Sequence, residues 1–237
     1  MRIAALLTGR GNNTLRDKNV LDILGHPVLY YPAHAARKCP LIDSYYCSSD
    51  DEKILCEAEK EGYLKIKRPE ELALPTSQHV DCVMHALNIM NERGDFPDIL
   101  VVLLANNVTV RSEWITDCIN EMIKSDDISA VVPVYEDNDH HPLRAKTIEQ
   151  DRLQMYEKNV TGVVSTNRQD LSPCFFLSHN FWVLKVKNLK SGIEGQAPWG
   201  FMGNNIVPYI IDSSIDIHHH VDLLIAQEWV KRNYKED

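Results

Sequence analysis

The residues near the amino terminus that could do chemistry form a short loop rich in glycine, asparagine and basic side chains. Between Thr8 and Asn19 the chain has two glycines, three asparagines and three basic residues against one acidic residue. Glycines let a ligand approach the backbone, and successive N–H groups can form a nest for an anion. The side chains of Arg10 and Lys18 could neutralise phosphate charge. The loop therefore predicts a phosphate site, and a solvated basic turn remains the alternative.

This loop matches neither of the two common glycine-rich phosphate motifs. It lacks the spacing of a P-loop, and Thr14 stands where the third glycine of a dinucleotide fingerprint would be. A nucleotide bound here would need another arrangement of the same groups.

A second group of candidate residues lies near the carboxyl terminus. If Ile215–Ile217 is a strand, Asp216 and His218 project to the same face and can share one cation. His219 and His220 follow directly, but no cysteine or acidic cluster surrounds them. Two interpretations stay open, a metal tract and a structural turn that caps the last helix.

Two further clusters are weaker. The residues from Lys67 to Leu72 favour a salt-bridged surface turn. The residues from His140 to Arg144 favour a polar loop with a basic edge, because adjacent histidines point in different directions on most backbones.

Composition limits the classes of function. The chain has 237 residues and a formal charge of −9, which argues against general nucleic-acid binding because that needs a basic surface. The longest apolar run, Ile99 to Ala105, is far shorter than the roughly 20 residues that span a bilayer. The run Ile3–Leu7 is too short for a secretory signal. The six cysteines have no C-x-x-C spacing and are expected to be free thiols, so we expect a cytoplasmic protein without membrane or nucleic-acid partners.

The elements that must position these groups alternate between strand and helix through the first 135 residues. Ser49 and Glu52 have capping-box spacing before one helix, and either Pro27 or Pro32 could lie in the first turn of the helix that ends near Arg37. Further helices are expected at about Ser77 to Arg93, Ser112 to Lys124 and Val221 to Asn233. Strands are expected at Ile3–Leu7, Ser44–Cys47, Ile99–Leu104, Ala130–Val134, Cys174–Leu177, Phe181–Val186, Ile206–Ile211 and Ile215–Ile217.

This rhythm predicts an α/β fold with a mostly parallel central sheet flanked by helices. The core would consist of residues 1–135 and 173–237, and the polar segment 136–172 would be an insert, either a β-hairpin excursion or a flap. In open parallel sheets, ligands bind beyond the carboxyl ends of the strands, which is where the loop after Ile3–Leu7 would lie.

Taken in order, the motifs resemble those of the acylneuraminate cytidylyltransferase (CMP-sialic acid synthetase) family over nearly the whole chain. The matching segments are the loop Gly9 to Asn19, Gly25-His26-Pro27, Ser48 to Asp51, Arg68 to Ala73, Asp81 with His85-Ala86-Leu87, His140 to Leu143, Arg168-Gln169 and Asp216-Ile217-His218.

The resemblance implies a Rossmann-like nucleotidyltransferase that uses CTP and Mg²⁺ and forms a homodimer through its insert. It implies attack by a 2-keto sugar acid on the α-phosphate of CTP. Catalytic roles would fall to Arg10, Lys18 and Asp216, and metal binding to Asp216 and His218. The nucleotide would contact Thr8, Gly9, Gly11, Asn12, Asn19 and Arg68. The acidic sugar would contact Asn106, Asn107, Arg144, Arg168, Gln169, Trp199 and Phe201.

Three departures from the family pattern leave alternatives open. The glycine loop is one residue shorter, Ala105 stands where a glutamine is expected, and His218 replaces an aspartate. The first hypothesis is a cytidylyltransferase for sialic acid or a related nonulosonate. A second is transfer to another acid, an octulosonate or a non-sugar, and a third is a nucleotide-binding homologue without turnover. Trp199 and Phe201 could cover the acyl group or form a contact between subunits.

Overall fold

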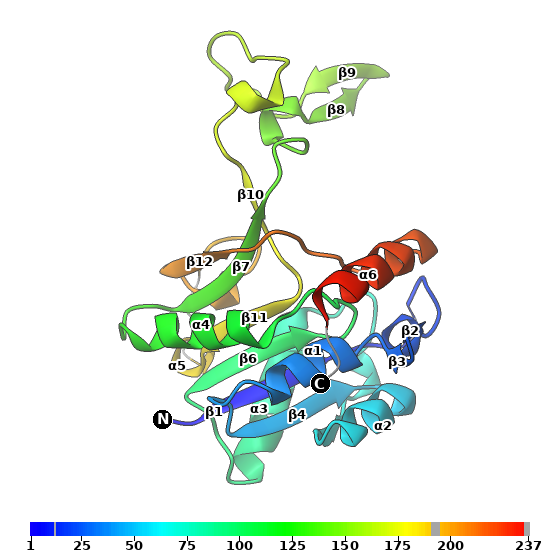
Figure 1. Ribbon diagram of the computed structural model, residues 1–237. Coiled ribbons are helices and arrows are strands. Elements are labelled where there is room, and N and C mark those ends of the chain that lie inside the picture. Colours follow the sequence, from blue (N-terminus) through cyan, green and yellow to red (C-terminus); the bar gives the residue numbers. More distant parts are fainter. Residues whose placement is uncertain (12, 191–194, 235–237) are drawn as a thin grey trace.

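The molecule is built around a mixed eight-stranded sheet with helices on both faces (Figure 1). The computed structural model describes residues 1–11, 13–190 and 195–234, so Asn12, one of the expected nucleotide contacts, lies outside the described residues. The strands of this sheet are β1 Ile3–Thr8, β4 Ser44–Ser49, β5 Leu64–Lys67, β6 Ile99–Leu104, β7 Ala130–Glu136, β10 Phe175–Leu177, β11 Phe181–Lys185 and β12 Ile206–Ile210. Seven of them follow the order β10-β7-β11-β6-β1-β4-β5, and β12 pairs with β7.

The sheet is mostly parallel, as expected. Strands β1, β4, β5 and β6 pair in parallel, whereas β11 lies antiparallel between β6 and β7. Strand β1 is buried along its whole length and β6 nearly so, because uninterrupted apolar runs suit strands that are covered on both faces.

The helices divide between the two faces of the sheet. Their bounds, with those of a two-stranded ribbon, are α1 Tyr30–Arg37, α2 Glu52–Lys60, α3 His79–Glu92, α4 Ser112–Ile123, α5 Val186–Lys190, α6 His220–Asn233, β2 Asp22–Ile23 and β3 His26–Pro27. Helices α1, α2 and α4 pack on the face that carries Ala5 and Leu7, and α3 packs with α5 on the face that carries Ala4 and Leu6. Helix α6 covers a smaller apolar cluster with the β2–β3 ribbon.

Two local expectations need correction, and one strand was not expected. Helix α2 begins at Glu52 with Asp51 as its N-cap, because the Asp51 carboxylate accepts from the Lys53 N–H while Ser49 Oγ accepts from the Asp51 N–H. Residues 215–217 form only an isolated bridge, Asn107 with Asp216, instead of a strand. Strand β5 was not expected. It has only four residues, and its alternating Leu-Lys-Ile-Lys pattern, typical of an edge strand with one exposed face, is too short and polar to stand out in the sequence.

The expected insert is an arm that leaves the body of the molecule (Figure 1). We call residues 137–174 the arm. It follows β7 and contains the ribbon β8 (Lys146–Glu149) and β9 (Arg152–Met155), and the chain then returns to the sheet as β10. The β8–β9 turn has two residues with positive φ, Gln150 and Asp151, as a tight hairpin turn requires.

Candidate functional site

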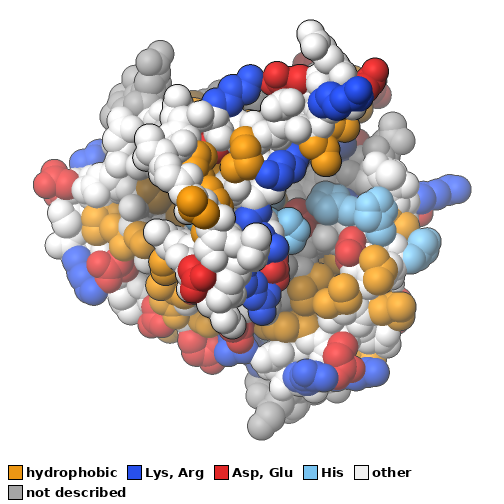
Figure 2. Space-filling model, turned by 90° about the horizontal axis from the view of Figure 1, so that it is seen from above, with side chains coloured by type: hydrophobic (Ala, Val, Ile, Leu, Met, Phe, Trp, Pro, Cys, Tyr) orange, Lys and Arg blue, Asp and Glu red, His pale blue; other side chains and the backbone are white. Residues whose placement is uncertain are grey.

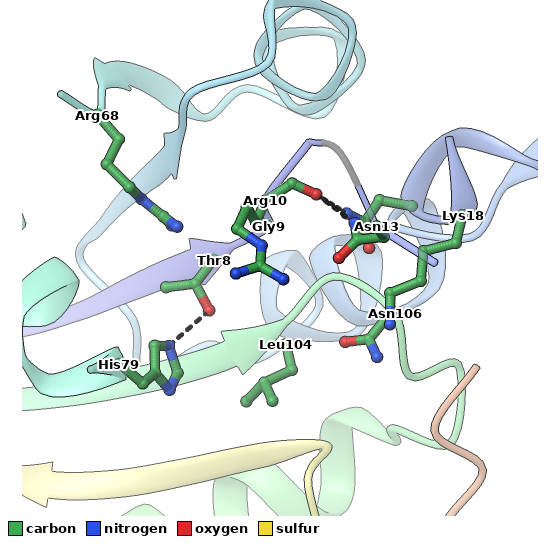
Figure 3. A pocket seen from close by; sticks show the side chains of 10 residues that line it. Thr8, Gly9, Arg10, Asn13, Lys18, Arg68, His79, Leu104 and Asn106 are labelled. Atoms are coloured by element: carbon green, nitrogen blue, oxygen red, sulfur yellow. Dashed lines mark hydrogen bonds between the residues drawn. The ribbon is translucent and has the colours of Figure 1, made fainter. Parts of the chain in front are cut away.

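A cavity of about 220 Å³ lies where β1 and β6 end. These parallel strands are in register, with Thr8 opposite Leu104, so their carboxyl ends meet at the same edge of the sheet. Ligands bind at such an edge in open α/β sheets. Its lining residues are Thr8, Gly9, Arg10, Asn13, Lys18, Asn19, Arg68, His79, Leu104 and Asn106 (Figure 3).

The glycine loop is held in place by its own asparagines. The Arg10 carbonyl accepts from Asn13 Nδ2 at 2.5 Å and from Asn19 Nδ2 at 3.0 Å. Gly9 fits tightly above α2, since a Cβ there would stand 3.2 Å from Ile54 Cγ2. The Arg10 guanidinium donates to the Leu74 carbonyl at 2.9 Å, and the Arg10 side chain lines the cavity (Figure 3).

One loop residue is less available than we expected. Gly11 does not line the cavity, and its N–H donates to Asp50 Oδ1 at 3.0 Å. Because this N–H is already used to anchor the loop to the end of β4, Gly11 is not free to bind phosphate.

Lys18 supplies a buried positive charge at one end of the cavity. It is only 8% exposed, and its Nζ donates to the Ile217 carbonyl at 2.8 Å. Burial lowers the pKa of the Lys18 ammonium, and the nearby carboxylate of Asp216 partly offsets this effect. A buried ammonium with few partners gains more from an incoming phosphate than an exposed one does.

Arg68 and His79 form the opposite end of the cavity (Figure 3). Arg68 is 5% exposed and is held by Ser48, whose carbonyl accepts from Arg68 Nη2 at 2.7 Å. His79, the first residue of α3, contacts Thr8 Oγ1 through Nε2 at 3.0 Å. Burial lowers the pKa of the His79 imidazole to about 4, and Arg68 and His179 contribute.

Asp216 lies beside the cavity among polar side chains. Its carboxylate accepts from Asn106 Nδ2, and it faces His218 Nε2 at 3.1 Å and His179 Nδ1 at 3.7 Å. Viewed from above, histidine side chains gather next to a hollow that Lys and Arg side chains also border (Figure 2).

The histidine tract has a structural role at the start of α6. His219 is the N-cap, and the Asp222 carboxylate accepts from the N–H groups of His218 and His219. Among residues 1–11, 13–190 and 195–234, no group of three or more His, Cys, Asp or Glu side chains could hold a metal ion. The capping interpretation of this tract is the one that the geometry supports.

Mg²⁺ prefers oxygen ligands, and one carboxylate together with substrate phosphates is a common way to hold it. Asp216 fits that requirement. His218 does not, because its imidazole is a poor ligand for a hard cation and is close enough to hydrogen-bond to the same carboxylate.

The neighbours Asn106 and Asn107 have different surroundings. Asn106 lines the cavity. Asn107 is fully buried, donates to the His179 carbonyl at 3.1 Å and accepts from the Thr109 N–H at 3.0 Å. The side chain of Asn107 is thus used inside the protein and is not available as an acceptor contact.

The three expected contacts on the arm lie apart from this cavity. Arg144 and Arg168 both pair with Asp139, and Arg168 and Gln169 border a separate hollow at the base of the arm. Because the arm projects from the body, these side chains do not line the cavity of their own chain (Figure 1).

Trp199 and Phe201 form an aromatic group behind the cavity. Trp199 packs edge-on against His179 with ring centroids 5.5 Å apart, and Phe201 packs against Trp182 at 5.8 Å. Trp182 in turn contacts His79 at 5.3 Å. Neither Trp199 nor Phe201 lines the cavity directly, so any contact with an acceptor would need a ligand that extends beyond it.

Sequence reasoning missed Asn13, His79 and Leu104 as lining residues. His79 is far from Thr8 along the chain, and only the packing of α3 beneath the end of β1 joins them. The position of Asn13 inside the basic loop was a signal that could have been used.

Comparison with known proteins shows what the chain is similar to. One curated relative, an N-acylneuraminate cytidylyltransferase of Escherichia coli O18:K1:H7 (strain RS218 / NMEC), is 31% identical over 96 residues, which span 40% of this chain and 23% of that protein. The match thus covers less than a quarter of the length of that relative.

Solved structures show the same fold. A CMP:2-keto-3-deoxy-manno-octonic acid synthetase complexed with CTP superposes with a TM-score of 0.71 at 12% identity, covering 98% of this chain and 99% of the other. A 4-diphosphocytidyl-2C-methyl-D-erythritol synthase of Anaerococcus prevotii DSM 20548 gives a TM-score of 0.66 at 14% identity, covering 98% and 96%.

The sequence model of one family, described as cytidylyltransferase, matches residues 10–179, from the glycine loop through the arm. This match takes in most of the chain and every strand from β4 to β10. The chain belongs to the cytidylyltransferase family.

Proposed function

We propose that the protein transfers the cytidylyl group of CTP to a hydroxyl of a 2-keto sugar acid and releases pyrophosphate. The observation that carries this proposal is the cavity at the ends of β1 and β6, which Arg10, Lys18 and Arg68 line in a chain of the cytidylyltransferase family. Transfer of a phosphoryl-type group depends mainly on positioning and charge neutralisation, which these three cations can supply.

In the proposed reaction the acceptor oxygen attacks the α-phosphorus of CTP. A new P–O bond forms as the bond between that phosphorus and the bridging oxygen breaks, and the hydroxyl proton passes to solvent. Lys18 and Arg10 neutralise the charge that accumulates on the departing pyrophosphate. The Asn13 and Asn19 amides keep the loop in the shape that presents Arg10.

We also propose that Mg²⁺ takes part, held by Asp216 together with the phosphates. When bound, the ion would polarise the phosphate oxygens and help neutralise the leaving group. Asn106 donates a hydrogen bond to the Asp216 carboxylate and so orients it, and the nearby positive charge of Lys18 balances the charge of this carboxylate.

The acceptor is proposed to be sialic acid or a related nonulosonate. The relative from Escherichia coli supports this class, whereas the fold neighbour that makes a CMP-octonic acid keeps an octulosonate as the alternative. Ala105 is fully buried under the loop and offers no polar group to an acyl chain, which favours an acceptor other than N-acetylneuraminate itself.

A homodimer in the cytoplasm completes the proposal. Arg144 and Arg168 lie on an arm that points away from their own cavity, so they would meet an acidic sugar only in a partner's site. The arm ribbon exposes an apolar cross-strand pair, Ile148 and Leu153, which are 73% and 71% exposed and suit burial against a second copy. No helix in the described part of the chain is long and apolar enough to cross a membrane.

The test is pyrophosphate release from CTP and Mg²⁺ with a panel of acids that includes N-acetylneuraminate and 3-deoxy-manno-octulosonate. We expect release with one sugar acid, and a loss of about a hundredfold or more in kcat for Lys18→Met. Arg10→Met should show a comparable loss. Arg16→Met is the matched control, because Arg16 belongs to the same loop but its side chain is 92% exposed and lies outside the cavity.

The outcomes separate three possibilities. Release of pyrophosphate with an octulosonate alone would show that the acceptor is an octulosonate and not a nonulosonate. Tight CTP binding without release of pyrophosphate for any acid would contradict the proposed transfer and favour a nucleotide-binding homologue without turnover. Equal activity of Lys18→Met and Arg16→Met would contradict the assigned site.

A further inference from the structure

His79 is a cavity residue that has no role in the mechanism given above, yet its hydrogen bonding specifies its chemical state. Thr8 Oγ1 donates its single proton to the Leu103 carbonyl at 3.1 Å. Towards His79 Nε2, 3.0 Å away, the same hydroxyl can therefore only accept. The proton of a neutral His79 ring must lie on Nε2, which leaves a lone pair on Nδ1.

The surroundings keep this ring neutral. Burial, together with the positive charge of Arg68 and the proximity of His179, lowers the pKa of His79 to about 4. At neutral pH the ring therefore presents Nδ1 as a hydrogen-bond acceptor. Within the described ranges 1–11, 13–190 and 195–234, Nδ1 has no hydrogen-bond partner.

Arg68 presents the complementary group at the same end of the cavity. Its Nε and Nη2 atoms donate to Ser48 Oγ and to the Ser48 carbonyl. Its Nη1 has no partner in the part of the chain that the structure describes. Arg68 and His79 both line the cavity at the end away from Lys18 and Asn106 (Figure 3). One wall thus offers a fixed donor and a fixed acceptor to a flat, polar ligand.

We propose that His79 is the residue that selects cytosine: its Nδ1 accepts a hydrogen bond from the 4-amino group, while Arg68 Nη1 donates to the N3 and O2 side of the base. Uracil carries an oxygen at position 4, so two lone pairs would face each other at His79. It also carries a proton on N3, which opposes the Arg68 donor. This inference rests on the proposed function, since it names the group that reads the base of the nucleotide substrate.

The experiment compares three nucleotides by titration calorimetry in Mg²⁺. CTP is compared with UTP and with zebularine triphosphate, a cytidine analogue that lacks the 4-amino group but keeps N3 and O2. For the wild type we expect zebularine triphosphate to bind about tenfold more weakly than CTP, the loss of one hydrogen bond, and UTP about a hundredfold more weakly.

Two substitutions separate the two nitrogens of the ring. In His79→Gln the amide reaches the Nε2 position and can keep the contact with Thr8, but nothing replaces Nδ1. We expect CTP and zebularine triphosphate to bind this variant within about twofold of each other. The variant has no acceptor for the 4-amino group, so a nucleotide that lacks this group loses no hydrogen bond. In His79→Asn the amide oxygen stands near the Nδ1 position, and the preference for CTP should remain.

His85→Gln is the matched control, because His85 lies on the same helix and outside the cavity. It should leave the ratio of the three dissociation constants unchanged. An ¹⁵N spectrum of the imidazoles gives a second measurement that does not depend on the variants folding. It should show the His79 proton on Nε2, and a proton on Nδ1 would overturn the proposal.

The remaining outcomes are distinguishable from a failure of the proposed function. If the wild type prefers CTP and His79→Gln keeps that preference in full, His79 does not select the base, although the cytidylyltransferase proposal stands. If the wild type binds CTP and zebularine triphosphate equally, the conclusion is again that His79 does not select the base, and the cytidylyltransferase proposal stands. If the wild type binds no nucleotide, the proposed function fails, and this inference fails with it.

Discussion

Asn106 and Asn107 show how neighbouring residues of one type can serve different ends. Asn107 is fully buried, and its amide joins the His179 carbonyl, Ser214 and Thr109 in one network. Asn106 reaches from the cavity to Asp216. Asn107→Ala should destabilise the protein by about 3 kcal/mol, because several buried polar groups lose their partner at once. Urea unfolding measures this loss.

Asn106→Ala is the paired variant. It should cost less than about 1 kcal/mol of stability, since its amide lies at the edge of the cavity, but it should reduce turnover by releasing the Asp216 carboxylate. Equal stability of the two variants would show that the buried network around Asn107 contributes little.

The lowered pKa of His79 predicts a pH dependence of stability. The folded protein binds the His79 proton only near pH 4, whereas the unfolded chain binds it near pH 6.5. Between these values the unfolded state holds more protons, so the free energy of unfolding falls as the pH falls, by about 3 kcal/mol from this group. Above pH 6.5 and below pH 4 this contribution is constant.

The measurement is urea unfolding of the wild type and of His79→Asn at pH 7, 5.5 and 4. As the pH falls, the unfolding free energy of the wild type should decrease more than that of the variant, because only the wild type has the titrating imidazole. A difference that stays constant across this range would show that the imidazole titrates alike in the folded and unfolded states.

At the scale of elements, the start of helix α2 illustrates a cap that differs from the one the motif suggested. The Asp51 carboxylate accepts from the Lys53 N–H at 2.8 Å, and it can be replaced without disturbing the core. Asp51→Ala should reduce the free energy of unfolding by about 1 kcal/mol, measured by chemical denaturation. Asp51→Ser should recover most of this stability. If Asp51→Ala is as stable as the wild type, the cap does not hold this end of the helix.

Predictability from the sequence follows the strength of local patterns. Strands β1 and β6 are apolar runs, and α4 has a clear helical periodicity, so the amino-acid pattern alone indicates where they lie. Strand β5 is a four-residue edge strand with alternating lysines, and such a segment also reads as a polar turn. The short helix α5 is hidden at the end of a strand-like run, because five residues are too few to show a period.

The residues of the candidate site also differ in how clearly the sequence indicates them. Arg10, Lys18 and Asn19 lie on one loop, so their proximity follows from the chain itself. Arg68 is indicated by resemblance to a family motif. His79 has no local signal, since its contact with Thr8 depends on how α3 packs under the sheet. Asn107 misleads because residue type alone does not tell a buried network from a binding surface.

At the scale of the whole molecule, the arm predicts that each site is shared between two chains. A Lys18→Met chain and an Arg168→Ala chain should each be nearly inactive. Mixed after mild unfolding and refolding, they should regain about a quarter of wild-type activity, since half of the dimers are mixed and one of their two sites is intact. Pyrophosphate release measures the recovery.

Sedimentation should show a dimer in all three preparations. Recovery confined to the mixture would support a shared site, whereas an Arg168→Ala chain with full activity would remove the arm arginine from acceptor binding. A monomer with full activity would contradict the dimer itself.

The hydrogen bond from Thr8 to Leu103 ties the cavity to the innermost pair of strands. Protein engineers who replace interior aliphatic side chains to gain heat resistance would shift one strand against its neighbour by fractions of an ångström. Such variants should be tested for which triphosphate they accept, because the base selection proposed for His79 depends on a hydroxyl that this pair of strands holds in place.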